Sequence, residues 1–168
     1  MNQNTYTVTP DVLASKNIRF ANFIIDYIIQ VILGIAISMV IGALSELTGS
    51  YAFYDLVIET EGRLSDYIFG TIILFIYYLT IETLTARSLG KYITKTKVVL
   101  HDGSKPEFTD ILKRTLSRIL PFEQFSFIGK ESTGWHDSIS KTYVVDISKF
   151  ETKIASIEGL NEIGKIGE

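Results

Sequence analysis

The sequence has no cysteine, and it has only three prolines, two methionines and one tryptophan. Without cysteine the chain has neither a disulfide framework nor a thiolate metal site. Charge is missing over one long stretch, because the 19 residues from Tyr27 to Ser45 contain no Asp, Glu, Lys or Arg. A cleaved signal peptide is not indicated, because the first 17 residues are polar and have no early apolar core or obvious cleavage site. The first apolar segment is therefore expected to remain in the mature protein.

The composition points to a membrane protein of one domain. The chain has 168 residues, which is the length of a single domain. Hydrophobic residues make up 46% of it and the mean hydropathy is +0.24, both high for a soluble domain of this size. The formal charge of −3 says little, because the charges are unevenly placed along the chain.

Two segments are long and apolar enough to span a bilayer. At about 1.5 Å per residue, Tyr27–Ser45 covers roughly 28 Å, close to one hydrocarbon thickness. Tyr67–Ile81 is shorter, and we expect its helix to continue to Ala86. With their flanks, the predicted spans are about 18–46 and 66–86. The alternative is a soluble core hairpin of two helices.

The charges that flank these segments predict an orientation. The predicted connecting loop, 47–65, lies in a stretch from Glu46 to Asp66 that holds five acids and one base. The other ends of the spans are basic; they carry Lys16, Arg19, Arg87, Lys91, Lys95 and Lys97. Because positive residues stay on the cytoplasmic side, we expect a multi-pass protein of the cell (inner) membrane. Both termini would be cytoplasmic and the loop extracytoplasmic.

The first span begins with polar residues that form one stripe. At about 100° per residue, Asp26 lies about 20° short of two turns from Arg19, and Gln30 lies about 20° past three turns. Asn22 lies some 60° to the side. Such a stripe faces protein or water while the other sides of the helix face lipid.

Two carboxylates, Asp26 and Glu82, are expected at similar depth near the inner boundary of the membrane. Placing an ionised carboxylate in hydrocarbon costs several kcal/mol unless it is protonated, paired with a cation or in contact with water. Arg19 is two turns from Asp26, too far for a good contact, and would more readily reach Glu82 or the cytoplasmic part. The alternatives are an ordinary positive-inside anchor for Arg19 and an interfacial, water-reached Asp26.

Span one also carries small residues at four-residue spacing, Gly34, Ser38 and Gly42. Such a ladder lets a second helix approach closely. Its partner is either span two or another copy of the chain, unless the spacing is a coincidence.

The cytoplasmic part, 87–147, is predicted to be a small α+β unit. Residues 92–100 and 143–147 are β-branched and form two candidate strands that pair. Residues 107–120 are amphipathic, with a capping box expected at Ser104 and Glu107. Phe108, Ile111, Leu112, Leu116, Ile119 and Leu120 line the apolar face, and Asp110, Lys113, Arg114, Ser117 and Arg118 lie opposite.

Two arrangements of the amphipathic helix are open. It either packs onto a small soluble core or lies along the inner leaflet, with its basic residues near anionic lipid. We favour the leaflet, because the cytoplasmic part offers little core. Trp135 suits the membrane interface. The polar N-terminal segment, 1–17, and a flexible tail, 148–168, would flank a membrane domain of residues 18–147.

The chain lacks the sequence signatures of an enzyme. His101 and His136 are each followed by Asp, which could indicate a metal or acid–base pair, but no further ligands accompany them. No nucleophile motif, phosphate loop or dinucleotide fingerprint is present. We therefore expect no catalytic site, metal or cofactor, and no nucleic-acid partner.

Three elements together resemble the RDD family of membrane proteins, whose name records one arginine and two aspartates. "RFANFIIDYII" resembles the opening signature, in which an aspartate follows the arginine by seven residues, as in Arg19 and Asp26. "RSLGKYITKTKVVLHDG" resembles the segment after the second helix; Gly90, Lys91, Val98, Val99, Asp102 and Gly103 match. "WHDSISKTYVV" resembles the closing element; His136, Asp137, Thr142, Val144 and Val145 match.

The resemblance covers roughly residues 16–147 and has two departures. Lys95 stands where the family often has a glycine, and the region from Leu120 to Gly134 is too short for the additional span that some relatives have. The resemblance implies a membrane topology and three marked residues, Arg19, Asp26 and Asp137, but no reaction.

From these residues we predict a polar cluster that ties the hairpin to the cytoplasmic part. Arg19 would bridge to Asp137, with Asp26 hydrogen-bonded nearby. The expected supporting residues are Asn22, Gln30, Glu82, Arg87, Lys91 and His136.

The expected function is a contribution to transport of an ion or small solute. Two helices cannot enclose a pathway, so transport would need a homo-oligomer or a membrane-protein partner. The alternative is a non-transporting adaptor or structural protein that organises a partner complex, and a membrane enzyme ranks third. A water-lined Asp26 at an interface between copies would favour transport, whereas an Asp26 sealed by Arg19 and Asp137 within one chain would favour structure.

Overall fold

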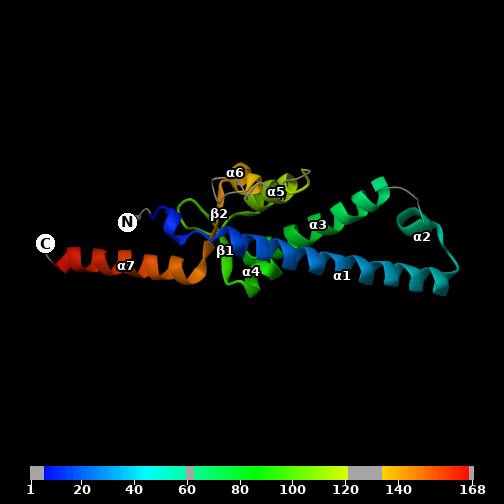
Figure 1. Ribbon diagram of the computed structural model, residues 1–168, viewed down its shortest axis with the longest axis horizontal. Coiled ribbons are helices and arrows are strands. Elements are labelled where there is room, and N and C mark those ends of the chain that lie inside the picture. The colour runs from blue at the N-terminus through cyan, green and yellow to red at the C-terminus, as the bar shows by residue number, and fades with distance from the viewer. Residues whose placement is uncertain (1–5, 60–62, 121–133, 167–168) are drawn as a thin grey trace.

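Two long helices, α1 (Lys16–Thr48) and α3 (Arg63–Thr85), form a hairpin that dominates the computed structural model (Figure 1). The structure describes residues 6–59, 63–120 and 134–166. Both helices are long and apolar enough to cross a membrane, yet only 11% and 22% of their most apolar stretches are buried within the chain. A soluble core helix would be mostly buried, so this exposure favours lipid around the hairpin. The predicted two-span fold is confirmed.

The ends of α1 follow from local sequence. The Ser15 side chain accepts a hydrogen bond from the Ile18 N–H, which satisfies one of the donors left open at a helix start. Gly49 ends the helix in the left-handed conformation, with φ of 67°, where glycine carries no Cβ penalty. Beyond it, α2 (Ala52–Tyr54) and the π-helical turn η2 (Asp55–Glu59) form the hairpin tip.

The small residues of α1 pack within this chain. A Cβ placed on Gly34 would lie 3.4 Å from Cδ1 of Ile73 on α3, and one on Gly42 would lie 3.7 Å from the Tyr54 ring. The predicted close approach is therefore made to the second span and the hairpin tip. No second copy is needed to cover this face.

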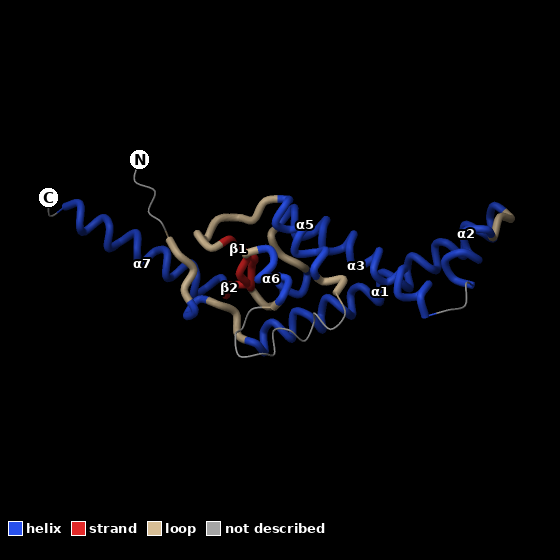
Figure 2. The backbone as a smooth tube through the Cα atoms, turned by 90° about the horizontal axis from the view of Figure 1, so that it is seen from above, coloured by secondary structure: helices blue, strands red, loops and turns tan. Residues whose placement is uncertain are grey.

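A basal unit sits at the opposite end of the hairpin from the tip. It comprises η1 (Pro10–Val12), α4 (Leu89–Ile93), β1 (Thr96–Leu100), α5 (Phe108–Ser117), α6 (Trp135–Ser140) and β2 (Thr142–Asp146). The strands pair antiparallel, with Val98 opposite Val144, and α5 and α6 lie in the connection between them (Figure 2). The N-terminal segment joins the outer side of β2, where Leu13 bridges Val145.

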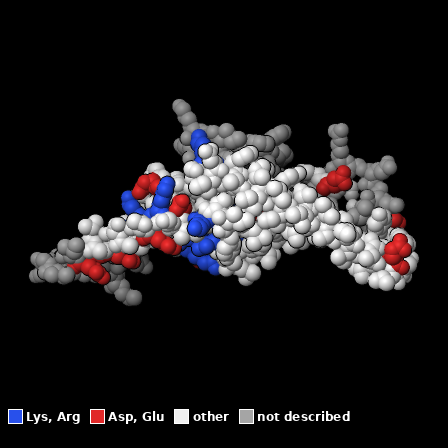
Figure 3. Space-filling model, turned by 60° about the horizontal axis from the view of Figure 1, so that its bottom comes forward, with Lys and Arg blue, Asp and Glu red and all other residues white. Residues whose placement is uncertain are grey.

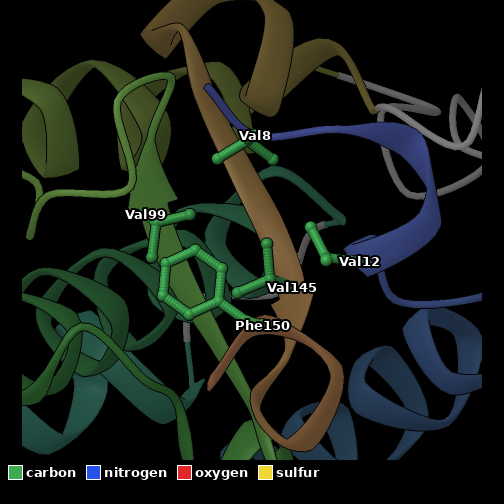
Figure 4. Packing of buried hydrophobic residues seen from close by; sticks show 5 residues of the cluster. All are labelled: Val8, Val12, Val99, Val145 and Phe150. Atoms are coloured by element: carbon green, nitrogen blue, oxygen red, sulfur yellow. The ribbon is translucent and has the colours of Figure 1, made fainter. Parts of the chain in front are cut away.

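The apolar core of the basal unit is small and draws on both ends of the chain. It consists of Val8, Val12, Val99, Val145 and Phe150, which point toward one another around the sheet (Figure 4). The segment predicted only to be polar thus supplies two core residues. Its backbone also donates hydrogen bonds from Ala14 to Val144 of β2 and from Val8 to His101, the residue that follows β1.

The first strand is shorter than predicted. Residues 92 and 93 belong to α4, whose first turn is capped by the Ser88 side chain, and β1 begins only at Thr96. Gly90 lies inside α4. Lys95 separates the helix from the strand in the left-handed conformation, with φ of 56°. That conformation explains why the family often has a glycine at this position.

Two further expectations were wrong in detail. The helix α5 is capped at Glu107, whose N–H donates to the Asp110 carboxylate at 3.1 Å, instead of by the pair expected at Ser104 and Glu107. Of the segment 148–168, predicted as a flexible tail, residues 148–166 lie in helix α7 (Ile147–Ile166), and residues 167 and 168 lie outside the described residues. This helix projects from the basal unit, away from the hairpin, so both ends of the chain lie at the same end of the molecule (Figure 1).

Candidate functional site

The polar stripe of α1 faces the rest of the protein. Arg19, Asn22 and Asp26 are all buried, although the helix around them is largely uncovered. Asp26 is 1% exposed, which rules out the alternative of an interfacial carboxylate reached by bulk water. The stripe meets groups from α3, α4, α5, α6 and the sheet, at the junction of the hairpin and the basal unit.

Asp26 is satisfied entirely by neutral donors. Its Oδ1 accepts from the Tyr77 hydroxyl at 2.7 Å and from the Gly90 N–H at 2.8 Å. Its Oδ2 accepts from the Ser88 hydroxyl at 2.5 Å and from the Tyr78 hydroxyl at 3.2 Å. Four donors to one carboxylate offset much of the cost of removing it from water.

This arrangement requires glycine at position 90. A Cβ there would lie 2.7 Å from the backbone oxygen of Asn22 and 3.0 Å from Oδ1 of Asp26. The absence of a side chain lets α4 approach α1 closely enough for its N–H to reach the carboxylate.

Asp137 joins three elements through two arginines. Its Oδ2 binds the Arg19 guanidinium from α1, and its Oδ1 binds the Arg114 guanidinium from α5. It also accepts from the Gly134 N–H at 3.1 Å, at the start of its own helix. The predicted bridge from Arg19 to Asp137 is confirmed, with Arg114 as a second partner.

The surrounding charges keep Asp137 ionised. Burial alone would raise its pKa, but the neighbouring Arg114, His136 and Arg19 outweigh burial and hold the pKa of Asp137 well below its usual range. Nε2 of His136 lies 3.4 Å from Oδ1 of Asp137. The pKa of Lys91 is lowered by burial, although Glu82 opposes that shift.

Glu82 is a second anionic centre, and it is fully buried. Its Oε1 lies 2.7 Å from Nζ of Lys91 and 3.0 Å from Nη2 of Arg118, and its Oε2 lies 3.3 Å from Nε of Arg114. Arg118 also stacks over the Tyr78 ring at 3.7 Å. These contacts join α3 to α4 and α5.

We call the two carboxylates Glu82 and Asp137, with their four basic partners, the ion-pair latch. Its basic members are Arg19, Lys91, Arg114 and Arg118. Next to the latch, the Asn22 amide donates to the Thr96 hydroxyl at 3.1 Å, and Arg114 donates to the Thr142 hydroxyl at 2.7 Å. These contacts connect β1 to the hairpin directly and β2 to it through Arg114 of α5, which also pairs with Glu82 of α3. Among the described residues, polar contacts hold the hairpin to the basal unit more than an apolar core does.

The orientation of α5 reverses the usual pattern of an amphipathic helix. Arg114 and Arg118 point inward to the latch, whereas Phe108, Leu116 and Leu120 are 53%, 50% and 46% exposed. Of the predicted apolar face, Ile111 is fully buried. The prediction that Arg114 and Arg118 lie near anionic lipid was wrong because both are buried, whereas Lys113 is exposed. Glu82 and Asp137 attract the arginines into the protein.

A cleft of about 640 Å³ extends from the latch between the two spans. Its walls come from α1 and α3, and Gln30 lies on its α1 side. Figure 3 shows one face of the molecule, on which the surface over the spans carries no charge. On this face acidic side chains lie at the hairpin tip and basic ones at the junction with the basal unit.

The structure brings together most residues predicted for the cluster. Arg19, Asn22, Asp26, Glu82, Lys91, His136 and Asp137 converge on the junction, and Gln30 lines the cleft. Arg87 lies apart, with its guanidinium 5.3 Å from the centre of the Tyr92 ring.

Sequence reasoning missed Tyr77, Tyr78 and Ser88, and it assigned Arg114 and Arg118 to the wet face. The two arginines are one helical turn apart, which was the available signal for a shared partner. No group of three or more potential metal ligands occurs among the described residues.

The comparisons with known proteins agree with the sequence elements described above. The model of the RDD family matches residues 13–150, which is most of the chain. No curated protein and no solved structure matches it.

Proposed function

The chain belongs to the RDD family, and from this premise we propose that it is a non-transporting membrane adaptor. In this role the ion-pair latch fixes the basal unit to the membrane hairpin, and the projecting helix α7 reaches a partner. The latch spans sequence separations of up to 118 residues, so it orders most of the domain around one point.

The burial of Asp26 is the observation that carries this proposal. Both of its oxygens already accept two hydrogen bonds within one chain, so the carboxylate has no vacant position for a passing ion. Farther along α1, no charged or amide side chain occurs between Gln30 and Glu46. A polar route would therefore end halfway along this span.

The proposal places the protein in the cell (inner) membrane with both termini in the cytoplasm. The shared position of the termini and the acidic hairpin tip support this orientation. Because the chain has no cysteine, Tyr54→Cys and Ser104→Cys report topology cleanly. An impermeant maleimide should label the two from opposite sides of the membrane, and labelling from the same side would contradict the hairpin orientation.

One observation favours a second candidate function, transport by an oligomer. The cleft brings Asp26 and Gln30 to the space between the spans, where a second copy or a partner could complete a polar route. In this case the cleft would face an interface instead of lipid.

Ion flux in proteoliposomes distinguishes the two functions. The native chain and Asp26→Asn should be reconstituted at equal density and compared with protein-free vesicles. The adaptor predicts flux equal to the protein-free background for both. Flux in the native chain that disappears in a folded Asp26→Asn variant would replace the adaptor with the transporter.

A further inference from the structure

The cleft between the spans has two chemically different ends. Phe23, Val31 and Leu74 give it apolar walls within the hairpin, and Arg19 and Arg114 line its end at the latch. Its volume of about 640 Å³ lies within the range of about 300–1,000 Å³ found for ligand pockets. From Arg19 to Gly34 the cleft follows 15 residues of α1, roughly 22 Å, which exceeds the ~15 Å of one hydrocarbon leaflet.

The basic end of the cleft is lined by buried guanidinium groups. Arg19 and Arg114 lie there, and both pair with the Asp137 carboxylate. A guanidinium group binds carboxylate and phosphate oxygens through a rigid fork of donors, so this end suits an anionic head.

Buried donors at this end also lack acceptors. Among the described residues, Nη2 of Arg114 and Nε of Arg19 have no hydrogen-bond partner. Arg114 is fully buried and Arg19 is 7% exposed, and both side chains line the cleft. Buried guanidinium donors rarely stay unpaired, because each unmade hydrogen bond leaves its desolvation cost unrecovered.

We propose that the cleft binds one anionic amphiphile, with its acyl chain between α1 and α3 and its anionic head at Arg114 and Arg19. The head supplies oxygens to the two guanidinium donors that lack a partner. The acyl chain of the ligand covers the apolar walls of the cleft where the two spans diverge. This site does not depend on the adaptor proposal, because neither the latch nor α7 needs an occupant to join the hairpin to the basal unit.

A glycine allows the chain-binding half to be blocked without altering a charge. Gly70 lines the cleft, and a Cβ there would meet no atom within 4 Å, so Gly70→Leu fills the cleft without a backbone clash. Gly159 on α7 is equally open but lies outside the cleft, which makes Gly159→Leu a matched control. Arg114→Lys keeps the charge but removes the forked donors at the head-binding end.

Native mass spectrometry of the full chain, released from detergent after incubation with defined lipids, measures occupancy directly. The probes are phosphatidylglycerol, phosphatidylcholine and a long-chain fatty acid at equal concentration. We expect one bound anionic molecule, with a preference of roughly tenfold over phosphatidylcholine, as expected from hydrogen bonds to charged donors. Gly70→Leu should lose that molecule and Gly159→Leu should retain it.

The probes also identify the source of the anion. Retention of phosphatidylglycerol assigns the site to a bilayer lipid, and retention of the fatty acid alone assigns it to a free carboxylate amphiphile. Equal retention of phosphatidylcholine, or unchanged occupancy in Gly70→Leu, would overturn the proposal. If Arg114→Lys does not fold, the comparison between Gly70→Leu and Gly159→Leu still decides whether the cleft binds the lipid.

Discussion

Breaking the bridge between Arg19 and Asp137 should have unequal effects on its two sides. Asp137 neutralises both Arg19 and Arg114, so Asp137→Ala leaves two buried guanidinium groups without that counterion. Removing one partner of a buried ion pair costs about 3–5 kcal/mol, and we expect the upper part of this range. Arg19→Ala leaves Asp137 still paired with Arg114, so we expect about 2–3 kcal/mol, the scale of a hydrogen bond to a charged group.

The double mutant should lose less stability than the sum of the two single mutants. Once Asp137 is absent, the buried Arg19 guanidinium has lost its counterion and destabilises the fold. Removing Arg19 from that variant therefore recovers part of the lost stability. We expect a coupling of at least ~1 kcal/mol, within the range seen for residues in one network. Asp137→Asn, which keeps the size of the side chain, provides a milder variant if Asp137→Ala does not fold.

Unfolding in mixed micelles can be followed by the fluorescence of Trp135, the only tryptophan in the chain, which lies in the same helix as Asp137. The exposed pair of Asp11 and Lys153, 2.9 Å apart with side chains 57% and 40% exposed, provides the control. Its coupling should be too small to resolve, because water screens the attraction between exposed charges. Additive losses within about 0.5 kcal/mol for Arg19 and Asp137 would refute the buried bridge.

Three other predictions follow from single positions. Lys95→Gly should stabilise the protein by ~0.5–1 kcal/mol in the same unfolding assay, because φ is 56° there; Lys95→Ala should bring no such gain. Gly90→Ala should destabilise it by about 1–3 kcal/mol, because the new Cβ would lie 2.7 Å from the Asn22 oxygen, and unchanged stability would contradict the close approach of α4. The pKa of Asp137 in the folded protein lies well below its usual value. The ionised carboxylate therefore stabilises the fold fully at any pH above its pKa in the unfolded chain, about 3.9. This stabilisation is lost only as the pH falls through the lower pKa of the folded protein. The stability advantage of the native chain over Asp137→Asn should therefore not decrease between pH 7 and about pH 5, and a decline within that range would contradict the prediction.

The hairpin and part of its polar cluster could be predicted because their signals are local. The charge-free run of the first span identifies a membrane helix by length alone. The seven-residue spacing of Arg19 and Asp26 places them on one face of that helix. Their partner Asp137 has no such local signal, and only the resemblance of its segment to the closing element of the family marked it.

The remaining partners could not be predicted because they depend on tertiary contacts. An amphipathic helix in water turns its charges outward, so Arg114 was assigned to the exposed face. Two distant carboxylates, Glu82 and Asp137, reverse this preference by pairing with the arginines of α5. The tyrosines that hold Asp26 were read only as part of an apolar run, since their hydroxyls have no sequence signature.

The helices α4 and α7 were not predicted because their sequences carry little helical signal. Residues 89–93 contain a glycine and a β-branched residue, so strand and helix propensities are close and the Ser88 cap decides. Helix α7 has almost no amphipathic pattern, so its periodicity gave no signal. Its first turn is fixed by Phe150, which packs into the core of the basal unit.

The ion-pair latch is tested most directly by distances between spin labels in liposomes. Labels at Ile28 on α1 and Ile139 on α6, both 52% exposed, measure the position of the basal unit relative to the hairpin. Labels at Ile32 and Ile72, 59% and 50% exposed, measure the hairpin itself. In the Asp137→Asn variant, pulsed electron spin resonance should show a broadened distribution for the first pair and an unchanged one for the second. A narrow, unchanged distribution for both pairs would contradict the role of the latch in joining the two halves.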